Sequence, residues 1–154
     1  MPRIQTTPNL AAFLDMIAKS EGTARYGDDD GYNVLVGGTL FTSYADHPRK
    51  LVSIRPGLAS TAAGRYQLLA RYFDTYKQQL HLPDFSPLSQ DAIALQQIKE
   101  CGAVNNIEAG HFSTAVVLCA HIWASLPGAG YGQHENTMAD LSAAYVAAGG
   151  TVAA

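Results

Sequence analysis

Glu21 is the ionisable residue whose position in this sequence is hardest to explain by folding alone. Apolar residues recur at i, i+3, i+4 and i+7, the spacing of one buried helical face, at Leu10, Phe13, Leu14 and Ile17. Glu21 lies four residues beyond Ile17, so at about 100° per residue it falls on the same face. Burial and the negative end of the helix dipole both disfavour an ionised carboxylate, so the sequence predicts a raised pKa.

A carboxylic acid that keeps its proton near neutral pH is suited to general-acid catalysis. Two structural explanations fit the same pattern. Glu21 can be a buried glutamate paired with an arginine or lysine, or a glutamate at a helix end whose charge reaches solvent. The helical pattern by itself does not decide between a catalytic acid, a buried ion pair and a solvent-reaching glutamate.

Other patterns that often carry chemistry indicate structural roles here. The run Asp28–Asp30 lacks the alternating oxygen ligands and distal glutamate of an EF-hand loop. The histidines show no HExxH or close paired spacing, and no serine lies in a nucleophile elbow. Cys101 and Cys119 lie in aliphatic helical contexts and are expected to be buried thiols. The sequence therefore predicts no metal site and no cofactor.

Length and composition bound the class of protein. The 154 residues predict a single domain, residues 1–154, and the 47% hydrophobic and 15% charged content is typical of a globular chain. A net charge of −3 argues against a general nucleic-acid binder. No apolar run reaches membrane-spanning length, so we expect no membrane insertion. The first residues lack the apolar core of a secretory signal, which predicts synthesis in the cytosol.

The elements that must position Glu21 are predicted next. Thr7 and Pro8 are typical of a helix start, and Gly22 of its end. Two short β-prone runs flank Gly37-Gly38, which indicates a hairpin, and the run 51–54 is expected to add a strand before Pro56-Gly57 interrupts it.

From residue 60 onward the chain is predicted to be helical. Periodicity predicts helices over 63–80, over 88–100 after the cap Ser86-Pro87, and over 137–150, and a short helix is expected near 104–110. The most apolar helix, 113–126, is predicted to be central. The fold class is therefore α+β, mainly helical with one small antiparallel β-sheet near the end of the first helix.

Five segments carry a resemblance to a known family: AFLDMIAKSEGT, VGGTLFTSYADHPRKLVSI, STAAGRYQLL, FSPLSQDAIALQQIKECGA and IWASLPGAGYGQ. The sequence resembles the lambda-type phage endolysins, which are lytic transglycosylases of the lysozyme superfamily. The resemblance covers residues 11 to 152 in the same order and spacing. It implies a lysozyme-like catalytic domain, and it places the catalytic acid on Glu21 within Ser20-Glu21-Gly22.

The resemblance also implies a substrate groove formed by residues 60–67 and 131–133. The residues themselves agree with that role, since Ser60 and Thr61 can cap the next helix and small neighbours permit close approach of a ligand. Tyr66 offers an aromatic surface and Gln67 an amide suited to N-acetyl sugars, although core packing of Tyr66 fits equally well.

The second part of that groove is the glycine-rich loop after Pro127. Tyr131 lies between glycines and is expected to be exposed and to contact sugar. Gln133 completes the motif that the resemblance identifies. The extension 1–9 and the end 151–154 match nothing specific in the family, and residues 134–136 follow the loop with a local chemistry of their own.

The implied reaction is cleavage of the β-1,4 bond between N-acetylmuramic acid and N-acetylglucosamine, with formation of a 1,6-anhydro sugar. A hydrolytic glycosidase normally needs two carboxylates, and near the sheet the sequence offers only Asp46 and Asp28–Asp30 as second candidates. Three alternatives remain open. They are a hydrolytic muramidase on the same scaffold, a non-catalytic wall-binding module, and a helical interaction protein with a buried ion pair.

The resemblance implies peptidoglycan glycan strands as the partner and no nucleic acid. We expect a monomer that is made in the host cytoplasm and acts on periplasmic peptidoglycan after a holin opens the membrane.

Overall fold

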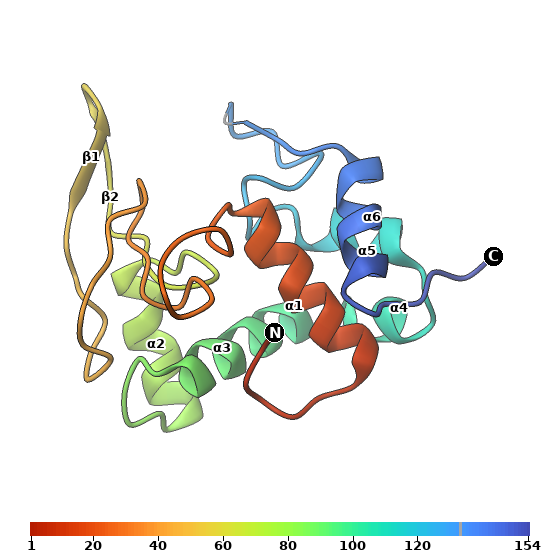
Figure 1. Cartoon of the computed structure of the whole chain (residues 1–154), viewed down its shortest axis with the longest axis horizontal. Helices are drawn as coiled ribbons and strands as arrows, with labels where there is room; N and C mark the ends of the chain where they lie inside the picture. Colours follow the sequence, from red (N-terminus) through yellow and green to blue (C-terminus); the bar gives the residue numbers. More distant parts are fainter. Residues whose placement is uncertain (133) are drawn as a thin grey trace.

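Helix α1, Pro8–Ser20, runs through the middle of the molecule and ends at Glu21 (Figure 1). The computed structural model describes residues 1–132 and 134–154. These residues form six helices and one two-stranded antiparallel sheet, which confirms the predicted α+β class. The remaining elements are β1 Val52–Arg55, β2 Leu58–Ser60, α2 Ala70–Leu80, α3 Pro87–Glu100, α4 Val104–Glu108, α5 Phe112–Cys119 and α6 Met138–Ala147.

Helix starts follow the local capping signals in the sequence. The Thr7 hydroxyl accepts from the N–H of Leu10 at 3.2 Å, and proline occupies the first turn of α1. Ser86 caps α3 and Thr137 caps α6 in the same way. At its other end, α1 stops because Gly22 takes a φ of +76°, a conformation that costs glycine little.

The sheet lies at a different place from the predicted hairpin. The turn at Gly37-Gly38 is supported by one isolated bridge, between Val34 and Leu40, rather than by regular strands. The two runs do pair across the Gly37-Gly38 turn, because the Leu35 N–H donates to Thr39 at 2.7 Å and the Phe41 N–H to Asn33 at 2.9 Å. The first of the two runs also bonds another segment: the Val36 N–H donates to the carbonyl of Ala62, and the Gly64 N–H donates to the carbonyl of Val34. The predicted turn is therefore present, but the runs flanking it do not form regular strands.

The hairpin is formed by β1 and β2, which the sequence had predicted only as one strand cut short. Val52 pairs with Ser60 and Arg55 with Leu58, so Pro56-Gly57 is the connecting turn and not an interruption. Gly57 has a φ of +78°, which suits the third position of a type II turn after proline. Figure 1 shows this hairpin at one end of the molecule, with α4 to α6 at the other and α1 between them.

The predicted helix 113–126 is shorter than expected, and α1 is the central helix. Helix α5 ends at Cys119, after which the chain turns so that Trp123 and Leu126 reach the core, at 3% and 0% exposure. The indole N–H of Trp123 donates to the carbonyl of Tyr66 at 3.1 Å. This contact fixes Trp123 in the core beyond the end of α5. No helix within the described residues has the length and apolarity to cross a bilayer.

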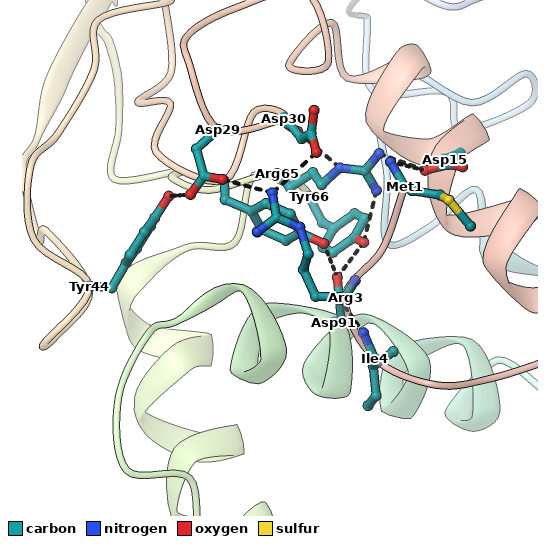
Figure 2. Close-up of polar contacts among 11 residues, drawn as sticks. Met1, Arg3, Ile4, Asp15, Asp29, Asp30, Tyr44, Arg65, Tyr66 and Asp91 are labelled. Atoms are coloured by element: carbon teal, nitrogen blue, oxygen red, sulfur yellow. Dashed lines mark hydrogen bonds and ion pairs between the residues drawn. The ribbon is translucent and has the colours of Figure 1, made fainter.

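A buried carboxylate on α3 fastens the N-terminal segment to the fold (Figure 2). Asp91 is fully buried, and its Oδ1 accepts from the hydroxyls of Tyr32 and Tyr66 at 2.7 and 2.6 Å. Its Oδ2 accepts from the backbone N–H groups of Arg3 and Ile4 at 2.7 and 3.0 Å. Four donors satisfy the charge, so burial of Asp91 is tolerated.

Two arginines extend the same network toward α1 (Figure 2). The guanidinium of Arg3 pairs with Asp29 and Asp30, and that of Arg65 pairs with Asp15 on α1. The Arg3 pairs connect the N-terminal segment to the loop after α1, and the Arg65 pair connects the segment before α2 to α1.

Candidate active site

Glu21 is the C-terminal capping residue of α1, and its backbone N–H donates to the carbonyl of Ile17 at 2.8 Å. Among the described residues, no arginine or lysine forms an ion pair with its carboxylate, so the ion-paired explanation does not hold. Removal from water raises the pKa of Glu21 to about 7. The carboxyl group is thus suited to hold a proton near neutral pH and to release it.

A cavity of about 710 Å³ opens on one side of Glu21. We call it the large cavity. The β1–β2 hairpin, the segment before α2 and the start of α2 form most of its wall. Apart from Glu21, Arg71 is the charged residue among those described that line it. Its lining consists of Glu21, Val36, Leu51, Ile54, Leu58, Ala59, Ser60, Thr61, Ala62, Gln67, Leu69, Ala70, Arg71, Ile122 and Ala124.

A second cavity, of about 160 Å³, opens beside Glu21 toward the Gly37-Gly38 turn. This small cavity is lined by Glu21, Gly22, Thr23, Arg25, Tyr26, Val34, Leu35, Gly37, Gly38 and Gln67. Glu21 and Gln67 line both cavities, so these two residues lie where the cavities meet. A chain-like ligand that occupies both cavities passes Glu21, as cleavage within a polymer requires.

Ser60 and Thr61 lie in the wall of the large cavity. The Thr61 hydroxyl accepts from the N–H of Ala70, the first residue of α2, at 3.1 Å. The helix predicted over 63–80 begins only at Ala70, and its N-cap is Leu69, which makes no side-chain cap bond. Thr61 is therefore not the N-cap, although its hydroxyl accepts from the first N–H of the helix. The Ser60 hydroxyl instead accepts from Ala62 at 3.1 Å and stabilises the local turn.

Gln67 is held in place between the two cavities. It adopts a φ of +53°, and its side-chain nitrogen donates to the carbonyls of Gly64 and Val34 at 2.9 and 3.3 Å. These bonds fix the amide relative to the Gly37-Gly38 turn without a ligand, so the side chain is preorganised.

Tyr66 and Tyr131 differ in exposure. Tyr66 is 5% exposed and donates its hydroxyl to Asp91, which favours the core-packing alternative over a sugar-stacking surface. Tyr131 is 56% exposed, and its hydroxyl donates to the carbonyl of His121 at 2.9 Å, next to Ile122 in the wall of the large cavity. Gln133 lies outside the described residues.

Among the described residues that line the two cavities, Glu21 is the only carboxylate. Asp46 is paired with Arg49 at 2.8 Å and Asp29 with Arg3 at 2.7 Å, and neither lines a cavity beside Glu21. Within the described part of the chain, no three histidine, cysteine, aspartate or glutamate side chains lie together as a metal site. The site is thus built around one carboxyl group.

Sequence reasoning missed the apolar wall that the hairpin contributes. Leu51 and Ile54 are 67% and 51% exposed, yet both line the large cavity. A two-stranded sheet has too little partner surface to bury both faces, so apolar residues on such a hairpin are a signal of a binding surface. Arg25 and Arg71, one in each cavity, were also missed.

A glutamate at the end of a core helix, in a groove beside a small antiparallel sheet, defines a site of the lysozyme type. The chain is similar to bacteriophage lambda lysozyme complexed with a chitohexasaccharide, at a TM-score of 0.95 and 56% identity. A second structure of lysozyme from bacteriophage lambda gives a TM-score of 0.90 and 56% identity. In both comparisons 97% of this chain and 99% of the lysozyme chain are covered.

Sequence comparison gives the family. The model of the Endolysin family matches residues 11–152. The endolysin of Escherichia phage lambda is 59% identical over 144 residues, which cover 92% of this chain and 91% of that protein. The endolysin of Escherichia phage P2 is 49% identical over 165 residues, which cover 99% and 100%. The chain belongs to the endolysin family, and the resemblance read from the sequence is confirmed.

Proposed function

We propose that this chain is a peptidoglycan-cleaving endolysin that acts as a lytic transglycosylase. It cleaves the β-1,4 bond between N-acetylmuramic acid and N-acetylglucosamine and so lyses the host cell. The observation that carries the choice of mechanism is that Glu21 is the only carboxylate among the described residues lining the two cavities. A hydrolytic glycosidase normally uses a second carboxylate to activate water or to form a covalent intermediate.

In the proposed reaction Glu21 acts first as an acid and then as a base. Its carboxyl proton passes to the glycosidic oxygen as the bond from that oxygen to C1 of the muramyl residue breaks. The C6 hydroxyl of the same residue then attacks C1, and the carboxylate of Glu21 takes the hydroxyl proton. A 1,6-anhydro sugar forms, the enzyme regains its proton, and no water is consumed. One carboxyl group suffices because the nucleophile is intramolecular.

The proposed substrate contacts follow the walls of the two cavities. Ser60, Thr61 and Gln67 line them, and Tyr131 lies on the exposed loop after Pro127. Gln133 is proposed as a further contact from the family resemblance alone. The chitohexasaccharide bound to lambda lysozyme, a related structure, supports binding of a β-linked N-acetyl sugar chain in this groove.

The remaining parts of the proposal concern how the enzyme is used. We infer a single catalytic domain over residues 1–154 that works as a monomer without a cofactor. Synthesis in the host cytoplasm, followed by holin-dependent access to the periplasmic wall, is in keeping with membership of the endolysin family.

Analysis of the products on purified peptidoglycan tests this proposal. Wild-type protein is expected to release muropeptides with anhydro ends, which are lighter by one water than reducing ends in a mass spectrum. Glu21→Gln removes the proton and is expected to lose about a hundred- to ten-thousand-fold in rate. Glu108→Gln, a change at the exposed end of α4, serves as the matched control and should retain activity.

Each other outcome identifies an alternative. Reducing ends from the wild type establish a hydrolytic muramidase. Binding to walls without released products indicates a wall-binding module. Full activity of Glu21→Gln removes Glu21 from the reaction altogether.

A further inference from the structure

Asn136 contacts the last turn of α1 from 116 positions away in the sequence. Its side-chain nitrogen donates to the carbonyl of Ser20 at 3.1 Å and lies 3.0 Å from the Ser20 hydroxyl oxygen. Ser20 immediately precedes Glu21 and is 9% exposed. Asn136 belongs to the segment 134–136, which follows the Tyr131 loop with a local chemistry of its own.

Ser125 completes this polar cluster behind the site. Its hydroxyl lies 2.8 Å from that of Ser20, and its carbonyl accepts from both the backbone and the side chain of Asn136, at 2.8 and 3.3 Å. The end of α1 is thereby joined to the loop that follows Trp123. We call Ser20, Ser125 and Asn136 the Ser–Ser–Asn cluster.

This cluster fixes the peptide group that leads into Glu21. The carbonyl oxygens of a last helical turn lack intrahelical donors, and Asn136 supplies one to Ser20. The N–H of the same peptide group belongs to Glu21 and donates to Ile17 at 2.8 Å. Both polar atoms of the Ser20–Glu21 peptide are therefore held. The direction in which the Glu21 side chain leaves the backbone depends on this plane.

No ion pair from a described arginine or lysine orients the Glu21 carboxylate itself. The orientation of the Glu21 carboxyl group must therefore be set by the backbone and by packing. A catalytic group displaced by about 1 Å can lose about a hundredfold in rate, so a device that fixes this backbone has a large effect on turnover.

We propose that Asn136 is a positioning residue, which holds the Ser20–Glu21 peptide so that the Glu21 carboxyl group meets the scissile bond. This inference rests on the proposed function, because the bond to be met is the glycosidic bond. Asn136 acts through the backbone and does not need to touch substrate.

The test compares Asn136→Ala with Asn9→Ala. Asn9 is a matched control, because its amide also bridges distant segments, donating to Ile107 and accepting from Thr151 at 3.0 Å each, at the opposite end of α1. Asn136→Ala is expected to lower kcat on purified peptidoglycan about tenfold or more and to leave KM unchanged. Asn9→Ala is expected to lower the melting temperature and to leave kcat unchanged at temperatures where it is folded.

The second readout is the titration of Glu21 by carboxyl carbon NMR, which requires no activity. The titratable groups that share its cavities are Arg25, Tyr26 and Arg71, and all remain in both variants. Releasing the peptide admits water to the carboxyl group, so Asn136→Ala should lower the pKa of Glu21 from about 7 toward its ordinary value. In Asn9→Ala that pKa should not move.

The two readouts separate the possible failures. If the wild type cuts no wall but Asn136→Ala still shifts the titration, the proposed function fails and the positioning contact stands. If Asn136→Ala matches Asn9→Ala in both kcat and titration, the cluster is merely structural and the inference is overturned. Should Asn136→Ala not fold, Ser125→Ala removes one hydroxyl of the cluster and should show the same two effects at smaller size. Normal kcat and titration in that variant also reject the inference.

Discussion

The guanidinium of Arg65 and the carboxylate of Asp15 form an ion pair with 2.6 Å between Nη2 and Oδ1. Arg65 is 2% exposed and also donates to the carbonyl of Asp30 and the hydroxyl of Tyr66. The pair connects the segment that forms one wall of the large cavity to the helix that ends at Glu21. It is therefore a contact on which the geometry of the proposed site depends.

Removing one partner of a buried ion pair leaves the other charge without compensation. Asp15→Ala leaves the buried guanidinium of Arg65 without its carboxylate, so it is expected to lower the free energy of unfolding by about 3–5 kcal/mol, measured by urea denaturation. Arg49→Ala breaks an exposed pair with Asp46 and Asp74 and should cost less than about 1 kcal/mol. Equal losses in the two variants would show that burial of Arg65 carries no special weight.

Tyr66→Phe separates the core role of Tyr66 from a role in sugar binding. The substitution removes one of four donors to the buried carboxylate of Asp91, so we expect a loss of about 1.5–3 kcal/mol in stability. KM for peptidoglycan should stay the same, because the ring has little exposed surface. Unchanged stability of Tyr66→Phe would show that the hydrogen bond from Tyr66 to Asp91 does not stabilise the core. Thermal unfolding and a substrate titration give the two values.

The elements that the sequence predicted well are those defined by local chemistry. Thr7, Ser86 and Thr137 start helices because a side-chain oxygen meets an N–H only three residues ahead. The position of Glu21 on an apolar helical face is equally local. Both features need only the helical repeat, so they can be predicted without a tertiary structure.

The features that the sequence missed are decided by distant partners. The runs around Gly37-Gly38 pair only through an isolated bridge, and the first of them also bonds residues 62–64, which are distant in the sequence. The end of α5 at Cys119 is set by where Trp123 can reach the core. The hydrogen bond from Asn136 to Ser20 spans 116 positions, so no local sequence pattern predicts it. The resemblance proposed residues for the site. Only the structure shows that Thr61 lies in the cavity wall, Tyr66 in the core and Tyr131 on an exposed loop.

Tyr131→Ala tests the exposed loop as a substrate contact. The ring is 56% exposed and is tied down only through its hydroxyl to His121, so its loss should change stability by less than about 0.5 kcal/mol. If the ring stacks on a sugar, KM should rise about five- to tenfold with kcat retained, in line with about 1 kcal/mol for such a contact. Tyr131→Phe keeps the ring and should restore KM. An unchanged KM in Tyr131→Ala would place substrate binding elsewhere.

Glu21→Gln should stabilise the protein in alkaline solution. Folding raises the pKa of Glu21 from 4.5 to about 7, so the folded state binds this proton more tightly than the unfolded chain does. The resulting stabilisation is fully present below about pH 4.5 and is lost as the pH rises through 7. Glutamine carries no charge to bury, so it avoids this loss.

The difference between the two proteins therefore depends on pH. Near pH 4 the free energies of unfolding of wild type and Glu21→Gln should nearly coincide, whereas near pH 8 the variant should be more stable by about 3 kcal/mol. Urea denaturation at both pH values measures the difference, and the reading near pH 4 is the internal control for the effect of the substitution itself. A difference that stays constant with pH would mean that the carboxyl group ionises in the folded protein as easily as in the unfolded chain. A group of that kind has already lost its proton at neutral pH and has none to give to the glycosidic oxygen.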